Sequence, residues 1–532
     1  MNLRRVAVLG GGPGGLYAAR LLKRSHPQAD VVVYEQSPPD RTFGFGVGIA
    51  SRTQQNLRDA DPESLESIVE AAHPHEMSMQ VGRQTARLSH GRLLAIARTR
   101  LLALLQGHAS DAGVRLHFGE RHDAAGLDAD LVVAADGINS ATRTGLAERF
   151  RPRITTGKGL YLWCGTDFAL PSAVFTPVTT THGTFVAHAY PYAADRSTFL
   201  IETDEQTWRR AGFDLATEQT GPQDSDEVSL KYLQEAFAET LQGHVLIGNR
   251  TRWLHFRTVS CESWHTGRTV LLGDAAHTAH YSIGSGTKLA MEDAIALDRA
   301  LLSATTVEEA LTEYERIRRP EVDYLQRIAR RSELWWESFS ERTDLPVDQL
   351  MIAYMTRAGK VSVDRFAASA PDVARRGLAA YADVASESVP AQDIAEWITK
   401  QPLTIHGGRF GSRLAPADLR DDPTTAVVSI DHPSAWNAEA DHTVHHAPGA
   451  RTLWLTGPSD RSAVLNRLDV AERLTRRTDA VVVVEAPRSR HADLVAGLAS
   501  ARTHLVHLTH ETAPDGDEAA GTPPDPATDA SA

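Results

Sequence analysis

The stretch RRVAVLGGGPGGLYAARLLKRSHPQADVVVYE, residues 4–35, decides the fold class of the chain. Its apolar spacing predicts a strand, a glycine turn, a helix and a second strand. Gly10, Gly12 and Gly15 complete G-x-G-x-x-G, and Glu35 ends the second strand. In such a unit the glycines permit a tight turn, close approach to a pyrophosphate and helix packing, while the acidic residue accepts from a ribose hydroxyl. The stretch predicts a Rossmann-like dinucleotide-binding domain, without deciding between FAD and NAD.

A second informative stretch is TVLLGDAAHTAHYSIGSGTKLAMEDA, residues 269–294. Its apolar start runs into Gly273 and Asp274, which predicts a buried strand that ends in a carboxylate at a tight turn. A His-rich loop follows, and the residues 284–287, GSGT, precede a helical pattern. The N-terminus of a helix offers unpaired N–H groups and a partial positive charge, which suit an anion or an electron-rich ring edge.

Two further features lie between these stretches. The strand pattern ADLVVAADG ends in Asp136 and Gly137, so Glu35, Asp136 and Asp274 are three acidic strand ends beside one glycine fingerprint. This arrangement suggests a single extended dinucleotide, with Glu35 at one ribose and Asp274 at the other sugar-like chain. Arg98 and Arg100 lie in the first turn of a predicted helix, where arginine opposes the helix dipole. This position suggests that an anion holds one of them, and solvated charge is the alternative.

Composition limits the classes of protein that this chain can represent. With 532 residues, 42% hydrophobic and 23% charged, it is typical of a soluble enzyme with two or three domains. The net charge of -13 argues against a general nucleic-acid surface. Cys164 and Cys261 are the only cysteines, so we expect no disulfide framework, no metal centre and a cytoplasmic location. The apolar runs are shorter than the roughly 20 residues that span a bilayer.

These motifs together resemble those of the single-component FAD-dependent aromatic hydroxylases, the class A flavoprotein monooxygenases. The resemblance rests on GGGPGG with Glu35, Arg98 with the following leucines, ADGINSATR, and GDAAH followed by GSG. Within that group, the salicylyl-CoA 5-hydroxylase and 2-aminobenzoyl-CoA monooxygenase branch is similar in TFGFGVGIA, YLWCGTDF, FVAHAYPYAADRSTFLIE, HYSIGSGTKLAMEDA and SELWWESF. The similarity covers about residues 4–345.

The resemblance implies FAD as cofactor and assigns it a set of contacts. The implied FAD-binding residues are Gly10, Gly12, Pro13, Gly14, Gly15, Glu35, Arg98, Asp136, Gly137, Gly273, Asp274, Gly284, Ser285, Gly286 and Thr287. The glycine turn would hold the pyrophosphate, Asp274 the sugar-alcohol chain, and residues 284–287 the pyrimidine end of the ring. Two positions depart from the family pattern, because Tyr281 stands where most relatives have proline and Lys288 where they have asparagine.

The same resemblance implies a reaction. NADH or NADPH would reduce FAD, O2 would form a flavin C4a-hydroperoxide, and an electron-rich ring would take the distal oxygen. An aromatic acyl-CoA such as salicylyl-CoA, hydroxylated at position 5 to gentisyl-CoA, is the first candidate substrate. The alternatives are 2-aminobenzoyl-CoA and an indole or tryptophan-derived intermediate. A different kind of flavin enzyme and a non-catalytic flavoprotein interaction module are the remaining alternatives.

Several aromatic and histidine residues are candidates for the reacting end of the site. We take His188, His280 and Tyr281 as catalytic candidates. The candidates for substrate contact are Trp163, His188, Tyr190 and Tyr281. For any single one, a core aromatic or a hydrogen-bonded structural histidine is the alternative. The arginines 318, 319, 327, 330 and 331 form a basic cluster that either guides the phosphates of a CoA ester or is simply solvated.

The expected fold class is α/β, with five parts along the chain. Residues 1–155 and 255–345 form a Rossmann-like FAD-binding domain, and residues 156–254 form an inserted substrate domain with an antiparallel sheet. A helical segment at 346–400 and a small α/β unit at 401–510 follow, and 511–532 are an acidic tail expected to be disordered. Larger members of the branch carry a barrel-type reductase after the hydroxylase, and 401–510 are too short for a complete barrel of ~250 residues.

Overall fold

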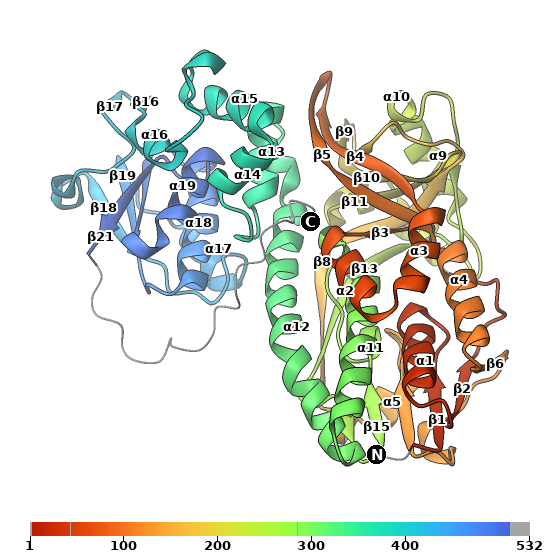
Figure 1. Cartoon of the computed structure of the whole chain (residues 1–532). Helices are drawn as coiled ribbons and strands as arrows, with labels where there is room; N and C mark the ends of the chain where they lie inside the picture. Colours follow the sequence, from red (N-terminus) through yellow and green to blue (C-terminus); the bar gives the residue numbers. More distant parts are fainter. Residues whose placement is uncertain (1–2, 43, 285, 511–532) are drawn as a thin grey trace. The chain divides into compact units, whose positions relative to one another are not determined.

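The computed structural model describes residues 3–42, 44–284 and 286–510, so the predicted tail and Ser285 lie outside the described residues. The chain forms two compact units (Figure 1). The first comprises the described parts of Met1–Ser78 and Gly91–Ser340, and the second those of Met79–His90 and Glu341–Ala530. Within the described ranges, no helix has the length and apolar character needed to cross a membrane.

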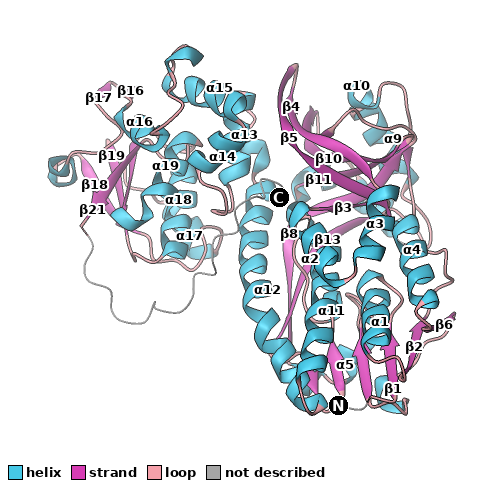
Figure 2. Ribbon diagram, viewed as in Figure 1, coloured by secondary structure: helices cyan, strands magenta, loops and turns pink. Residues whose placement is uncertain are grey.

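A mainly parallel six-stranded sheet forms one end of the first unit (Figure 2). The strand order is β14-β15-β7-β1-β2-β6. The bounds are β1 (Arg5–Leu9), β2 (Asp30–Glu35), β6 (Arg115–Phe118), β7 (Leu131–Ala134), β14 (His265–Thr266) and β15 (Thr269–Leu271). Strand β1 pairs in parallel with both β2 and β7, and only β14 is antiparallel. These strands read as valine-rich runs because both faces of a parallel sheet are buried.

Four long helices pack around this sheet. They are α1 (Pro13–Ser25), α4 (Arg98–Asp111), α11 (Gly286–Ser303) and α12 (Val307–Glu337). Helix α1 connects β1 to β2, as the opening stretch of the sequence predicts. Helices α11 and α12 lie side by side, and α1 packs against α11 (Figure 1). Helix α12 begins with a capping box between Thr306 and Glu309, which satisfies two backbone donors of its first turn.

A nine-stranded antiparallel sheet forms the other end of the unit (Figure 2). Its order is β12-β8-β11-β10-β9-β4-β5-β3, and β13 also pairs with β8. The bounds are β3 (Gly46–Ile49), β4 (His73–Val81), β5 (Gln84–Ala97), β8 (Pro152–Thr166), β9 (Ala173–Thr180), β10 (Gly183–Ala193), β11 (Arg196–Thr203), β12 (Leu246–Ile247) and β13 (Trp253–Cys261). The sheet therefore extends beyond residues 156–254, because β3, β4 and β5 come from earlier in the chain.

The two faces of the antiparallel sheet have different partners. One face carries Leu160, Leu162 and Phe199, which pack with residues of the nearby helices in an apolar cluster. Successive side chains alternate between faces, so Tyr161 and Trp163 point the other way. Short helices complete the unit: α2 (Ser51–Ala60), α3 (Pro62–Ala71), α5 (Ala141–Gly145), α6 (Ala147–Phe150), α7 (Glu205–Arg210), α8 (Phe213–Gln219), α9 (Glu227–Ala236) and α10 (Ala238–Leu241).

The second unit begins with helices and continues as a small α/β layer. Its helices are α13 (Val347–Thr356), α14 (Val363–Ser369), α15 (Pro371–Ala382), α16 (Ile394–Lys400), α17 (Ala438–His445), α18 (Arg461–Thr475) and α19 (His491–Ala499). Its strands are the hairpin β16 (Leu403–Ile405) and β17 (Gly408–Phe410), and the parallel set β18 (Thr425–Ser429), β19 (Thr452–Thr456), β20 (Val481–Pro487) and β21 (Leu505–Thr509). The parallel strands follow chain order, with one helix between each pair. This is half the strand number of an eight-stranded barrel.

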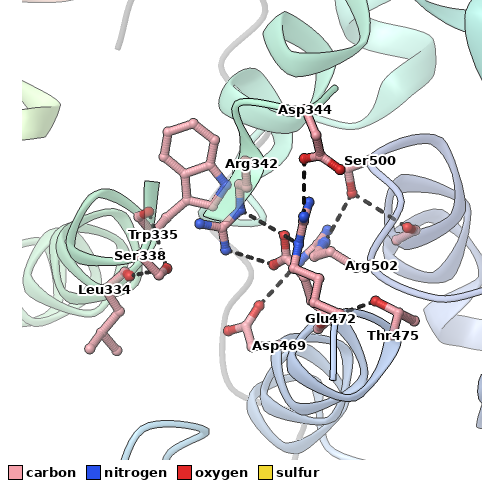
Figure 3. Close-up of polar contacts among 12 residues, drawn as sticks. Leu334, Trp335, Ser338, Arg342, Asp344, Asp469, Glu472, Thr475, Ser500 and Arg502 are labelled. Atoms are coloured by element: carbon pink, nitrogen blue, oxygen red, sulfur yellow. Dashed lines mark hydrogen bonds and ion pairs between the residues drawn. The ribbon is translucent and has the colours of Figure 1, made fainter. Parts of the chain in front are cut away.

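A buried ion pair joins the start of the second unit to its α18. Both side chains of Arg342 and Glu472 are almost fully buried, and they form two hydrogen bonds of 2.7 Å (Figure 3). Arg476, which directly follows that helix, donates to Asp344 at 3.1 Å. These contacts fix the residues that follow α12 against the helical layer of this unit.

Candidate active site

The glycine turn after β1 presents an accessible backbone at its centre. Gly10 has φ +103°, and a Cβ there would lie 2.2 Å from the carbonyl oxygen of Ala135. A Cβ on Gly15 would lie 2.1 Å from the oxygen of Gly10. By contrast, a Cβ on Gly12 would meet nothing within 4 Å. Gly10 and Gly15 therefore serve close packing of strand and helix, while Gly12 faces open space.

A cavity with about 340 Å³ of room for the centres of water molecules lies beside this turn. Predicted residues from residues 4–35, from the start of α4 and from residues 269–294 line it: Gly12, Pro13, Glu35, Arg98, Asp274, Gly286 and Thr287. Arg41 and Gln106 also line it, and the sequence motifs did not indicate them. No sequence motif contains these two residues, and only the fold brings them to the cavity.

Glu35 is held in place by backbone donors at the end of β2. Its carboxylate accepts hydrogen bonds from the backbone N–H groups of Gly11 at 2.7 Å and Ser37 at 2.8 Å. One bond comes from the glycine turn and the other from the residues after the strand. The carboxylate is therefore oriented at the mouth of the turn, where a ribose hydroxyl would reach it.

Arg98 and Asp274 bring opposite charges to the same cavity. The Asp274 side chain is exposed to the cavity, yet the surrounding protein raises its pKa, an effect that His277 and Arg98 oppose. Burial lowers the pKa of Arg98, which is the first residue of α4. Charged groups at a desolvated cavity wall are suited to hydrogen-bonding ligand hydroxyls and phosphates.

The other predicted cofactor residues shape turns rather than the cavity wall. Asp136 Oδ2 accepts from Thr142 N at 3.0 Å, while its Oδ1 is buried without a hydrogen-bond partner among the described residues. Positive φ values occur at Gly137, Gly273 and Gly284. A Cβ on Gly14 would lie 2.8 Å from Ala290 Cβ and Leu272 Cδ2, so this glycine permits packing of α1.

Asp293 of α11 braces the turn that carries Asp274. Its Oδ2 accepts from Gly273 N at 3.0 Å and lies 2.9 Å from His277 Nε2. Its Oδ1 accepts from Arg318 Nε at 2.9 Å. Although burial works against ionisation, His277 and Arg318 lower the pKa of Asp293 to about 2. The carboxylate is charged at neutral pH and ties α11 and α12 to the turn.

Aromatic rings surround Tyr281 of the short 3-10 helix η3 (Tyr281–Ile283). The centroid of the Tyr281 ring lies 4.1 Å from that of His280, 6.3 Å from His188 and 6.3 Å from Trp163. Tyr161, which the sequence reading did not single out, is nearer than Trp163 at 4.9 Å. The structure thus brings the three catalytic candidates and Trp163 together in one aromatic wall.

The wall continues onto α12 through Trp336. The ring centroids of His188 and Trp336 are 4.1 Å apart, and Phe175 of β9 lies 5.0 Å from His188. His280 Nδ1 lies 2.8 Å from Ser282 Oγ, so this imidazole nitrogen is engaged within the turn. Tyr190 is a less open candidate, because its hydroxyl donates to the carbonyl oxygen of Gly46 at 2.8 Å.

Much of the arginine cluster of α12 is engaged in local ion pairs. Arg318 is buried and pairs with Asp293, Glu292 and Glu321. Arg319 pairs with Glu315 and lies over the Trp264 ring, and Arg330 pairs with Glu333. Arg318 is therefore buried against acidic residues rather than solvated, whereas Arg327 and Arg330 are exposed. The physical reason is that the acidic residues of α11 and α12 reach the same helix faces.

Comparisons with known proteins agree on one family. The FAD binding domain family model matches residues 120–329. The salicyloyl-CoA 5-hydroxylase of Streptomyces sp is 43% identical over 369 residues, which cover 68% of this chain and 71% of the relative. The 3-hydroxy-4-methyl-anthranilyl-[aryl-carrier protein] 5-monooxygenase of Streptosporangium sibiricum is 38% identical over 67% of this chain and 95% of the relative. The chain belongs to the FAD-dependent aromatic monooxygenases.

A solved structure supports the fold of this monooxygenase. That of 2-methyl-3-hydroxypyridine-5-carboxylic acid oxygenase matches with a TM-score of 0.52 and 21% identity, over 67% of this chain and 96% of the other. This likeness confirms the predicted fold class, while the family model and the two relatives confirm the predictions of FAD and of a monooxygenase activity. NAD(P)H is the co-substrate typical of the class.

The residues of the cavity fit FAD. An open backbone at Gly12 and the N-terminal end of α11 suit phosphate and ring oxygens, and Glu35 and Asp274 are acceptors for sugar hydroxyls. Bound FAD supplies the redox and oxygen chemistry of the reaction. The protein contributes binding, orientation and the aromatic wall around Tyr281. Among the residues that the structure describes, no group of three or more His, Cys, Asp or Glu is arranged to hold a metal ion.

Proposed function

We propose that this monooxygenase hydroxylates the ring of an aromatic acyl thioester, with salicylyl-CoA as the first candidate and gentisyl-CoA as its product. The observation that carries the proposal is the 43% identity to a relative named salicyloyl-CoA 5-hydroxylase. The second relative is named for an anthranilyl group on a carrier protein, which is also an aromatic acyl group with an ortho substituent. Both names describe an electron-rich ring attached through a thioester-type carrier. 2-Aminobenzoyl-CoA is therefore the second candidate.

Roles of individual residues are part of the proposal. The backbone at Gly12 approaches the FAD pyrophosphate, Glu35 accepts from the adenosine ribose, and Asp274 accepts from the sugar-alcohol chain. Arg98 contacts the cofactor from α4. Gly286 and Thr287 at the start of α11 face the oxygen-rich end of the flavin ring, where the helix dipole favours negative charge.

The substrate ring occupies the aromatic wall in this proposal. Trp163, His188 and Tyr281 lie within one cluster of rings, which offers stacking and edge contacts to an aromatic ligand. The indole Nε1 of Trp163 is buried without a hydrogen-bond partner among the described residues, so it is available to a carbonyl or hydroxyl of the ligand. A cytoplasmic location also belongs to the proposal, since both cysteines are free and buried.

The test measures NADH oxidation and product formation by the purified protein under air. Salicylyl-CoA, 2-aminobenzoyl-CoA and the two free acids are compared, and products are identified by mass spectrometry. We expect salicylyl-CoA to stimulate NADH oxidation and to gain one oxygen atom at position 5. Stimulation by the free acids alone would remove the thioester part of the proposal. Absence of hydroxylated product with all four compounds would contradict the proposal as a whole.

A further inference from the structure

Glu202 of β11 is a buried carboxylate that the FAD site does not use. It is 9% exposed, and its Oε1 has no hydrogen-bond partner among the residues described. In the register of the antiparallel sheet it lies opposite Tyr161 of β8 and Val186 of β10. Alternation of side chains places it on the same face as Tyr161 and His188, which is the face of the aromatic wall. A buried acidic group with an unsatisfied oxygen calls for an explanation.

The groups that face Glu202 are titratable groups of the candidate active site. His188 Nε2 lies 3.4 Å from Glu202 Oε2. Although burial works against ionisation, His188, His280 and Tyr281 hold the pKa of Glu202 below its usual value. Burial and the charge of Glu202 raise the pKa of Tyr281 well above its usual value, with smaller effects of Tyr161 and Glu333. Glu202 is therefore a carboxylate next to a protonated tyrosine at neutral pH.

A small cavity lies beside Glu202 and is lined in part by residues of the aromatic wall. Its lining includes Glu202 and Tyr281 together with further polar residues, namely Asp204, Glu333, Glu337 and Ser340. The cavity leaves about 30 Å³ for the centres of water molecules, which is enough for about two waters. Its acidic lining favours a proton and disfavours the phosphates of a CoA ester. Tyr281 and Glu202 both line this cavity, so water held in it can connect them along a path for a proton.

We propose that Glu202, supported by His188, relays a proton between the substrate ring and this water-holding cavity through the hydroxyl of Tyr281. The inference rests on the proposed function, because it assumes a ring bearing a hydroxyl or amino group at Tyr281. The O–H or N–H bond of the ring substituent breaks as Tyr281 accepts that proton and gives its own to Glu202. The O–H bond formed on Glu202 then breaks as the proton passes to water. No electrons are exchanged in these steps.

The relay raises the electron density of the substrate ring before oxygen transfer. An ionised phenol is more electron-rich than a neutral one, so removal of the proton activates the ring. The low pKa of Glu202 keeps its carboxylate ionised between pH 6 and 8. Titration of this group therefore does not change the rate of the wild-type protein in that range.

The test uses the FAD-loaded full-length protein and salicylyl-CoA, with single-turnover hydroxylation followed by rapid quench from pH 6 to 9. Glu202→Gln keeps the shape and removes the acceptor. We expect its hydroxylation rate at pH 7 to fall about tenfold or more. The loss should shrink as pH rises, because solvent base then ionises the ring hydroxyl directly. Glu202→Asp should restore a pH profile like that of wild type.

Glu205→Gln is the matched control, because Glu205 is exposed at the start of α7 and pairs with Arg209. It removes one negative charge near β11 without lining the cavity, and we expect a wild-type profile. A second readout follows the ultraviolet absorbance of bound salicylyl-CoA after a jump from pH 6 to pH 8. Ionisation of the ring hydroxyl should be slower in Glu202→Gln than in wild type. FAD content serves as the check on folding.

The outcomes separate the relay from the proposed function. A loss in Glu202→Gln that is the same at every pH, or a rate within twofold of wild type at pH 7, would overturn the relay while the hydroxylase activity stands. No hydroxylation of any aromatic by the wild-type protein would overturn the proposed function. In that case an unchanged rate of ionisation after the pH jump would overturn the relay, and a slower rate in Glu202→Gln would support it.

Discussion

Asp274 is the acidic side chain of the FAD cavity that is most open to a ligand. We predict that Asp274→Ala binds FAD about tenfold or more weakly, because a hydrogen bond to a charged group contributes roughly 1.5–3 kcal/mol. Flavin absorbance per mole of protein after gel filtration measures this loss. Asp274→Asn keeps one acceptor oxygen and should retain more flavin. A wild-type flavin content in Asp274→Ala would refute the assigned role.

Asp293 contributes to stability in a way that depends on pH. His277 and Arg318 lower its pKa to about 2, below the usual value of 3.8. A depressed pKa stabilises the folded state above the unfolded pKa, and this contribution, roughly 2 kcal/mol, is lost as pH falls through the folded pKa. We predict that Asp293→Asn lowers the free energy of unfolding at pH 7 and that the difference from wild type shrinks below about pH 4. Urea unfolding at both pH values measures it, and a constant difference would contradict the prediction.

At the scale of elements, the glycines at the junction of β1 and α1 have two different roles. Gly15 permits close packing, whereas Gly12 faces the space for the ligand. We predict that Gly15→Ala destabilises the fold, because its Cβ would lie 2.1 Å from the oxygen of Gly10. Gly12→Ala should fold normally, since nothing lies within 4 Å of its Cβ, and should bind FAD more weakly. Thermal unfolding of the FAD-free proteins and FAD titration measure the two effects. Equal stability of the two variants would show that this geometric distinction is wrong.

The aromatic wall is also a property of elements rather than of one motif. Trp163 lies on β8, His188 on β10, Tyr281 on η3 and Trp336 on α12. The sequence pointed to three of these residues through their likeness to family segments. It did not point to Glu202 or Tyr161, although both lie on the predicted strands. Strand register decides which face of the sheet a residue lies on, and only the paired sheet shows that register.

At the scale of the whole molecule, part of the chain lies outside the region that it shares with two of its relatives. Two relatives are covered over 94–95% of their length by 66–67% of this chain. About one third of the chain therefore has no counterpart in them, and the second unit accounts for a similar share. Its four parallel strands in chain order form an α/β layer with its own apolar cluster around Trp454.

The buried pair of Arg342 and Glu472 anchors the first residues of the second unit (Figure 3). We predict that Arg342→Ala lowers the stability of this unit by roughly 3–5 kcal/mol, because it leaves a buried carboxylate without its partner. Replacing both residues, Arg342→Met with Glu472→Leu, should recover most of the loss. Chemical unfolding followed by circular dichroism measures this. A double variant no more stable than Arg342→Ala would count against the ion-pair explanation.

Short motifs in the sequence predicted the cofactor fold, the family and several of the residues that line the FAD cavity. The reason is that glycine conformations, strand ends and helix starts are local, so Gly12, Glu35 and Asp274 can be recognised within short motifs. The contacts of Arg318 and Glu202 could be identified only from the tertiary structure. Arg318 belongs to a basic cluster in sequence but is buried against Asp293, and Glu202 looks like one more strand residue but faces Tyr281. Contacts between distant segments depend on strand register and helix packing, which no local pattern contains.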